Sequence, residues 1–189
     1  MLTKNKFWMF PISFCLLFLI LGTASCGKKS VAPTSDTDGL NLLKNSSFEQ
    51  DGEPSVEGWE GISSCNVYRD APTAVGGGLW CLLLSGGCVW ETALYPLNSA
   101  EDGGIYELNC WARKEQYGVG GAGISFFNKT KGEFGRSAPA ISKKWHKIVL
   151  IDTLDFAPGD SIYVLLEAGG GFAGSCTGFF DLVKVIKRN

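Results

Sequence analysis

The 189-residue sequence has little of what several common protein classes require. Its 17 basic and 19 acidic residues give a formal net charge of −2, so it has no basic excess to neutralise a nucleic-acid backbone. A serine or cysteine triad would depend on the single histidine, His146, and no Gly-x-Ser-x-Gly turn occurs. The sequence also has no Cys-x-x-Cys pair and no Gly-x-x-x-x-Gly-Lys loop. We therefore expect no nucleic-acid binding, no catalytic triad and no zinc site.

Long amphipathic stretches with a helical period are absent too, whereas glycine and aromatic residues are common. The chain has 25 glycines, and 45% of its residues are hydrophobic against 19% charged, which is too apolar for a disordered protein. Short apolar runs lie between glycine-rich turns: Leu79–Leu84, Val89–Leu97, Ile105–Arg113, Gly123–Asn128, Trp145–Ile151, Ser161–Ala168 and Phe179–Ile186. This pattern predicts an all-β fold, a two-sheet antiparallel β-sandwich with one core.

Residues 1–25 are typical of an export signal. Lys4 and Lys6 supply a positive start, and the apolar run Phe7–Leu21 follows. That run is shorter than the roughly 20 residues of a membrane-spanning helix, so it favours a cleaved signal peptide over a permanent membrane anchor.

Two cleavage sites compete after this segment. The stretch Thr23–Cys26 resembles the lipobox of bacterial lipoproteins, in which the cysteine is diacylated and becomes the mature N-terminus, although Leu21 lies five residues before it rather than three. Ordinary cleavage after Ala24 is the alternative and would leave a secreted or periplasmic protein. We favour lipidation of Cys26, because residues 26–39 are polar with Gly and Pro, as in a flexible tether. The expected location is the cell envelope, with membrane contact through the acyl chains.

An ordered series of motifs runs through residues 40–189. Asn41–Glu49 and Gly58-Trp59 open it, Tyr106–Arg113 forms its centre, and three later segments complete it: Trp145–Lys147, Ser161–Glu167 and Gly178–Val183. In this order they resemble the carbohydrate-binding jelly rolls of the CBM4/9/22-like, galactose-binding-like superfamily. The resemblance implies a jelly-roll sandwich over the whole segment and, less specifically, sugar binding, because this fold serves many functions.

Alternation along two of the predicted strands selects candidate ligand-binding side chains. In Ile105–Arg113 the apolar register leaves Trp111 and Arg113 on the other face, and in Ser161–Ala168 it leaves Tyr163 and Glu167 outward. An indole stacks on a pyranose ring, and a guanidinium or carboxylate binds its hydroxyls. The resemblance implies that both strands belong to the concave sheet, where the four side chains would converge. The alternative is that Trp111 packs under a loop and pairs with Arg113 for structure.

The other tryptophans divide into two groups. Trp80 and Trp90 flank the Gly86-Gly87 turn and are further ligand candidates, unless they cap one end of the sandwich, whereas Trp59 and Trp145 are assigned to the core. Covering about 60 Å² of one ring at about 25 cal/mol per Å² gives roughly 1.5 kcal/mol. Two or three such contacts predict a weak affinity, of order micromolar to millimolar.

One acidic residue falls in an apolar register. Asp181 is two and four residues from Val183 and Val185, so alternation along a strand puts it on the same, inward-facing side. A buried carboxylate needs a cation, hydrogen bonds or a proton. The resembled family often has a structural calcium near its N-terminal strand, which implies Glu49 as a second ligand and backbone carbonyls as the rest. Hydrogen bonds at a strand end are the alternative, and Leu182 stands where many relatives have another acid.

Seven cysteines include Cys15 in the leader and the proposed lipid acceptor. The five that remain are Cys65, Cys81, Cys88, Cys110 and Cys176. An exported protein is in a compartment that permits disulfides, and Cys81 and Cys88 flank a glycine turn, so they are the first expected pair. Five is an odd number, so at least one cysteine stays free or pairs between chains. Cys110 lies in an apolar register and is expected in the core.

These observations favour a non-catalytic envelope lipoprotein that binds a polysaccharide or glycan weakly on an aromatic sheet face. The alternative is a structural or protein-interaction lipoprotein with an envelope protein as partner and no sugar binding. A glycoside-processing enzyme is third, because two of the 19 acidic residues would suffice for its chemistry.

Overall fold

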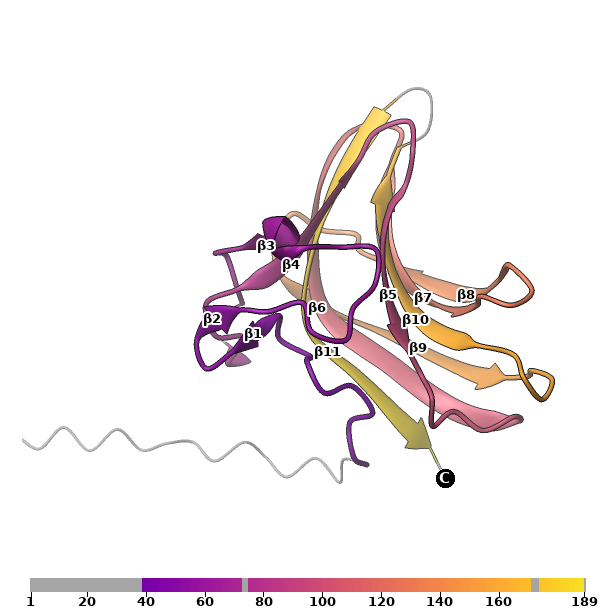
Figure 1. The fold of residues 1–189 in the computed structure, drawn as a ribbon. Helices are drawn as coiled ribbons and strands as arrows, with labels where there is room; N and C mark the ends of the chain where they lie inside the picture. The colour runs from indigo at the N-terminus through magenta and orange to yellow at the C-terminus, as the bar shows by residue number, and fades with distance from the viewer. Residues whose placement is uncertain (1–38, 73–74, 171–173, 189) are drawn as a thin grey trace, which may run out of the picture. The chain divides into compact units, whose positions relative to one another are not determined.

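The computed structural model describes residues 39–72, 75–170 and 174–188 (Figure 1). Their elements, in chain order, are β1 (Glu49–Gln50), β2 (Glu53–Pro54), the 3₁₀ turn η1 (Ser64–Asn66), β3 (Val67–Tyr68), β4 (Cys81–Gly86), β5 (Glu91–Pro96), β6 (Gly104–Gly118), β7 (Gly121–Asn128), β8 (Glu133–Pro139), β9 (His146–Leu154), β10 (Ile162–Gly169) and β11 (Gly174–Arg188). The predicted all-β fold is confirmed. None of the described residues belongs to a helix able to cross a membrane. The expected signal peptide (1–25), Cys26 and nearly all of the tether lie outside the described residues.

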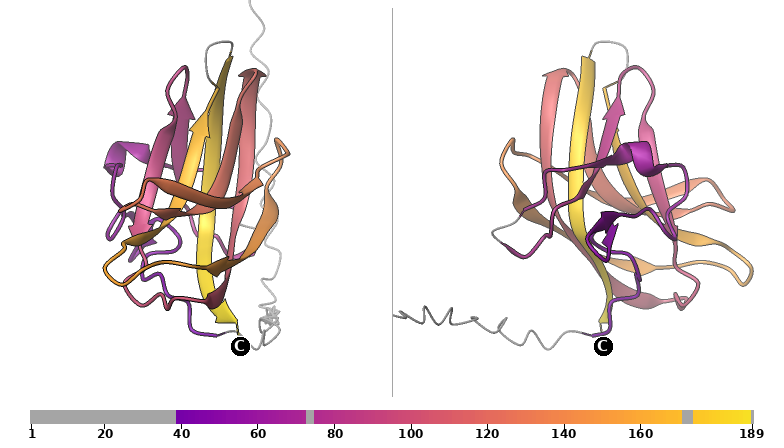
Figure 2. Two further views of the ribbon diagram at one scale, coloured as in Figure 1. Left: turned by 90° about the vertical axis from the view of Figure 1, so that its right-hand side faces the viewer. Right: turned by 60° about the vertical axis from the view of Figure 1, so that its left-hand side comes forward.

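Two antiparallel sheets make up the sandwich. One has the strand order β3-β4-β11-β6-β9 and the other β5-β10-β7-β8, while β1 and β2 form a small hairpin of their own. In the right-hand view of Figure 2, β11 (yellow) runs along the middle of the five-stranded sheet with β6 and β4 beside it. The N-terminal segment, in indigo, lies beside the C-terminal part of β11, where the Leu42 N–H bonds to the Val185 carbonyl and the Val183 N–H to the Ser46 carbonyl, and its Leu43 and Phe48 side chains belong to the core (Figure 1). The predicted two-sheet sandwich is therefore confirmed.

The core follows the predicted alternation. On β6, Tyr106, Leu108 and Cys110 are fully buried and pack in one cluster with Val164 and Leu166 of β10. Because side chains alternate along a strand, the residues between them point to the outer faces. The predicted place of Cys110 in the core is confirmed.

Besides the two-residue strands β1, β2 and β3, the sequence analysis did not predict β8. β8 pairs with β7 at the edge of the four-stranded sheet, and nearly all of its residues are exposed. An exposed edge strand needs no apolar alternation, so its sequence has no hydrophobic signal. It nevertheless supplies part of the candidate site described below.

A β-bulge in β11 reverses the predicted orientation of Asp181. The register between β11 and β6 shifts between Asp181 and Lys184, and Leu182 has a left-handed φ of 50°. Asp181 therefore pairs with Trp111 and shares its outer face, whereas Val183 is part of the core. The prediction that Asp181 points inward is wrong, because one extra residue moves every earlier side chain to the opposite face. The residue is still buried, since other segments cover it from outside.

The expected disulfide between Cys81 and Cys88 is wrong. Both cysteines are free in the structure. Strands β4 and β5 belong to different sheets, so the turn between them does not close a hairpin. Cys81 begins β4, whereas Cys88 follows its other end and is exposed.

Candidate functional site

The four outward side chains predicted to converge do not share a face. Trp111 and Arg113 lie on β6 of the five-stranded sheet, whereas Tyr163 and Glu167 lie on β10 of the four-stranded sheet. The predicted alternation is right for each strand, but the outer faces of the two sheets of a sandwich point in opposite directions. The predicted convergence is therefore wrong.

The Arg113 guanidinium makes a cation–π contact and hydrogen bonds with neighbouring side chains. Its guanidinium lies 3.5 Å from the centroid of the Phe179 ring, donates from Nε to Asp70 Oδ2 over 3.1 Å, and donates from Nη1 to Glu115 Oε1 over 2.7 Å. Trp145 lies 5.7 Å away and is half-buried on this outer face rather than in the core. Arg113 thus has a structural role on the outer face of its sheet, as the alternative expected, but its partners are Phe179, Asp70 and Glu115, whereas the alternative named Trp111.

Two further tryptophans lie away from any open sheet face. The Trp80 indole donates to the carbonyl of Gly52 over 3.0 Å and is half-buried beside the β1–β2 turn. Trp59 is buried against Phe48 and Tyr95, with ring centroids 5.1 and 5.3 Å apart. The core assignment of Trp59 is confirmed.

The outer face of the four-stranded sheet holds a groove of about 380 Å³, which we call the Trp90 groove. Its lining residues come from β5 and its preceding turn, β7, β8 and β10: Trp90, Thr92, Ser125, Phe134, Gly135, Ser137 and Glu167. Cross-strand pairing puts these side chains on one face, because Glu167 lies opposite Thr92 and Ser125 lies opposite Ser137. Trp90 and Glu167 were expected in a ligand site, whereas the residues of β8 were not.

Glycines let the Trp90 ring lie against the sheet. A Cβ on Gly169 would come within 2.9 Å of Trp90 Cδ2, and one on Gly121 within 3.5 Å of its Cη2. The ring therefore rests on backbone that has no side chains, while the residue remains 45% exposed. A supported, exposed indole is a stacking surface for an apolar ring face.

Polar groups without protein partners surround this ring. Glu167 is half-buried, forms no hydrogen bond or ion pair among the described residues, and has its pKa raised by burial. In the described part of the chain, the Ser125 hydroxyl is also buried without a hydrogen-bond partner. Polar groups in such surroundings normally have partners, so the accessible carboxylate of Glu167 can accept bonds from a polyhydroxylated ligand.

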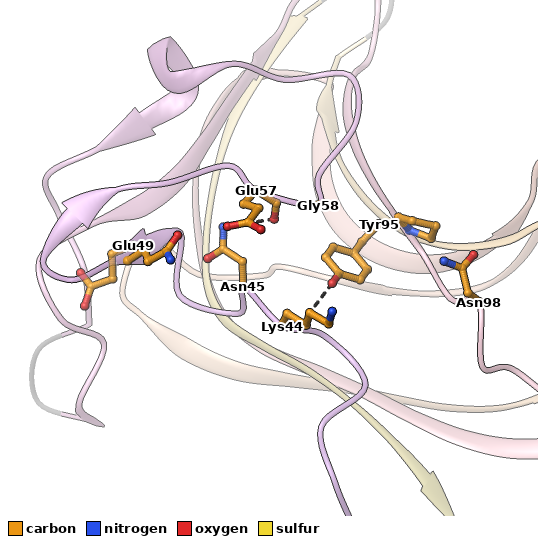
Figure 3. A pocket seen from close by; sticks show the side chains of 9 residues that line it. Lys44, Asn45, Glu49, Glu57, Gly58, Tyr95 and Asn98 are labelled. Atoms are coloured by element: carbon orange, nitrogen blue, oxygen red, sulfur yellow. Dashed lines mark hydrogen bonds between the residues drawn. The ribbon is translucent and has the colours of Figure 1, made fainter.

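A larger cavity of about 590 Å³ lies beside the end of β5 (Figure 3). It is lined by Lys44, Asn45, Glu49, Gln50, Glu57, Gly58, Tyr95, Pro96 and Asn98. The Tyr95 hydroxyl accepts the backbone N–H of Lys44 over 3.1 Å, and the residue is only 8% exposed. This cavity offers polar groups but no open aromatic face, so the Trp90 groove is the better stacking site.

Asp181 and Glu49 form a separate carboxylate pair. Asp181 is fully buried; its Oδ1 accepts the Leu182 N–H over 2.7 Å, while Oδ2 has no partner among the residues that the structure describes. Burial raises the pKa of Asp181 to about 8, a change that the hydrogen bond from Leu182 opposes and the nearby charge of Glu49 reinforces. Two acids that face each other without a cation are unfavourable when both are ionised.

Two glycines let the backbone approach both carboxylates closely. A Cβ on Gly77 would come within 2.5 Å of Asp181 Oδ2, and one on Gly78 would overlap the Glu49 carboxylate. Among the described residues no third His, Cys, Asp or Glu joins the pair. Calcium takes six to eight oxygens, so backbone carbonyls and water would complete its coordination.

Comparison with known proteins shows the fold. No protein-family model matches the sequence, and it has no significant match among curated proteins. TmCBM61 in complex with β-1,4-galactotriose has a TM-score of 0.52 at 14% identity, over 79% of this chain and 100% of that one. Tailspike protein 4 of bacteriophage CBA120 has a TM-score of 0.51 at 16% identity, over 78% of this chain and 21% of that one.

The CBM22-1 and GH10 modules of Clostridium thermocellum xylanase 10B, complexed with xylohexaose, have a TM-score of 0.50 at 8% identity, over 80% of this chain and 29% of that one. The similarity therefore extends over the whole of TmCBM61 but over only a minor part of the two larger proteins. Its fold is a jelly roll of the carbohydrate-binding-module type, as the motifs implied.

Proposed function

We propose that this protein is a non-catalytic glycan-binding module and that the Trp90 groove is its binding site. The observation that carries the proposal is the exposed Trp90 ring, supported by glycines, beside the unpaired carboxylate of Glu167. The ring stacks on the apolar face of a sugar, and Glu167 binds its hydroxyl groups. One large stacking ring supports a weak affinity, of order micromolar to millimolar.

Affinity electrophoresis through β-1,4-galactan and xylan tests this proposal. These polymers are chosen because two proteins of similar fold are complexed with galactotriose and xylohexaose. The protein should be retarded by at least one polymer, and Trp90→Ala should abolish the retardation without lowering the melting temperature by more than a few degrees. Trp111→Ala, on the opposite sheet, is the matched control and should bind normally. Equal retardation of the Trp90→Ala variant, or hydrolysis of the polymer, would contradict the proposal.

We also propose that the module is lipidated at Cys26 and tethered to the cell envelope by residues 26–39. The lipobox-like Thr23–Cys26 and the polar composition after it support this. Anchoring raises the effective concentration of a weakly binding module near its polymer. Mass spectrometry of the mature N-terminus should find a diacylated Cys26, whereas an unmodified Ser25 would refute lipidation.

A second candidate function is contact with another envelope protein. Exposed apolar side chains on the outer face of the five-stranded sheet favour it. Val149 and Ile151, neighbours on the outer side of β9, are 47% and 50% exposed. Exposed apolar side chains on a sheet face are typical of protein contact sites. Replacing both by lysine should remove chemical cross-links to an envelope protein and leave glycan binding intact.

We further propose that Asp181 and Glu49 hold a structural calcium ion. The orphaned Asp181 oxygen and the nearby charge of Glu49 support it. The ion would neutralise both carboxylates and join β11 to the N-terminal segment. Titration calorimetry of chelator-treated protein with calcium tests the site, and an unchanged melting temperature with and without chelator would remove it.

A further inference from the structure

The outer face of the four-stranded sheet is closed halfway along its strands. Leu165 and Ser125 lie opposite each other on this face, pointing away from the core, yet each is only 2% exposed. Trp90, beyond Glu167 on the same face, is 45% exposed. The face is therefore open beside Trp90 and covered at its middle, while along β8 the Trp90 groove reaches Phe134.

Three side chains cross the face at the closed end, and we call them the strap: Glu60, Lys129 and Tyr163. Glu60 pairs through its backbone with Leu94, at the free edge of β5. Lys129 follows the end of β7, where its N–H bonds to the carbonyl of Ser161 over 2.9 Å. Tyr163 lies between them on β10. The strap thus spans the sheet from one side of β10 to the other.

The strap is held by three mutual contacts. Lys129 Nζ lies 2.8 Å from Glu60 Oε2 and 4.8 Å from the centroid of the Tyr163 ring. The Tyr163 hydroxyl donates to Glu60 Oε1 over 3.3 Å. An ammonium over its face prevents the Tyr163 ring from stacking on a sugar. Tyr163, expected among the ligand-binding residues, is instead a part of this closure.

A pair of phenylalanines adds to the wall at this end. Phe127 lies opposite Tyr163 on the neighbouring strand, and its ring centroid is 4.9 Å from that of Phe134, which lines the groove. The ion pair of the strap is half exposed on both sides, and such pairs add little to folding stability. The main consequence of the strap is that it occupies the path along the sheet.

We propose that the Trp90 groove binds the terminal unit of a saccharide chain and that the strap excludes internal segments. This inference rests on the proposed glycan-binding function. A chain bound through an internal unit must leave the groove at both ends, and one of those exits lies where the strap crosses. A chain end needs only the open exit beside Trp90. Lys129 and Glu60 are thus specificity-determining residues for chain ends.

The number of protein molecules bound per polymer chain tests the inference. Linear β-1,4-galactan and xylan fractions of increasing length are mixed with excess protein and analysed by sedimentation velocity. Wild-type protein should bind one molecule per chain at every length. The double variant Glu60→Ala/Lys129→Ala should bind in numbers that rise with length, and its affinity for hexasaccharides over disaccharides should increase at least tenfold. Lys147→Ala, an exposed lysine on β9, is the matched control and should behave like wild type.

The outcomes separate the two proposals. Wild-type occupancy that grows in proportion to chain length refutes chain-end binding but leaves glycan binding intact. A double variant that keeps one molecule per chain, with an unchanged melting temperature, refutes the role of the strap. Failure of the wild-type protein to bind either polymer contradicts the proposed function, and the inference falls with it.

Discussion

Removal of the buried charge at Asp181 should change how the stability of the metal-free protein depends on pH. The pKa of Asp181 is about 8 in the folded protein, against about 4 in an unfolded chain. The folded state therefore holds this proton more tightly, so its contribution to stability is fully present below pH 4 and is lost as the pH rises toward 8. The difference corresponds to about 5 kcal/mol.

Scanning calorimetry in the presence of a chelator measures this effect. For a chain of this size, about 5 kcal/mol lowers the melting temperature by on the order of 10 °C between pH 4 and pH 8. Asp181→Asn keeps the shape of the side chain and removes the ionisation, so its melting temperature should be nearly level over this range. Saturating calcium should cancel the decline in wild-type protein, because a bound cation stabilises the ionised carboxylate.

Glu49→Gln is the companion variant. It keeps an oxygen that can accept the backbone N–H groups of Leu79 and Trp80, which bond to Glu49 over 2.8 and 3.3 Å, but it removes the charge facing Asp181. The decline with pH should become smaller, and calcium should stabilise less. A chelated wild-type protein that melts at one temperature from pH 4 to pH 8 would refute the reasoning, as would an Asp181→Asn variant with an unchanged decline.

Three further predictions follow from the packing. Gly169→Ala places a methyl group within 2.9 Å of Trp90 Cα and Cδ2, so the Trp90 ring must move. Titration calorimetry should then show at least a tenfold loss of glycan affinity. An unchanged affinity would mean that this ring is not the stacking surface. Glu167→Gln should weaken glycan binding about tenfold. Because burial raises the pKa of Glu167, the affinity of the wild-type protein should fall with decreasing pH at a higher pH than an ordinary glutamate would give. A Glu167→Gln variant with the same pH profile as the wild type would contradict this. Arg113→Ala should lower the free energy of unfolding by about 2 kcal/mol in denaturant titrations, because it removes the stack on Phe179 and two ion pairs. Arg113→Lys should recover only part of this loss. Neither variant should change glycan binding.

Alternation along each strand could be predicted because it is a local property. The apolar register of Ile105–Arg113 identified Trp111 and Arg113 as outward, and they are. Asp181 could not be placed in this way, since Leu182 adds one residue to β11 and its left-handed φ has no signature in the sequence. The predicted disulfide failed for a related reason: a glycine turn shows where a strand ends, but not whether the next strand joins the same sheet.

The sequence by itself determined that the described chain is all-β and which side of each strand enters the core, because burial repeats every second residue. Only the tertiary structure decided which outer faces belong together. It places Trp111 and Glu167 on opposite sheets. It brings Trp90 and Glu167 together with residues of β8 in one groove, and it brings Glu60 and Lys129 into contact over Tyr163. The physical reason is that sheet membership depends on hydrogen bonds between segments far apart in the chain, which no local pattern records.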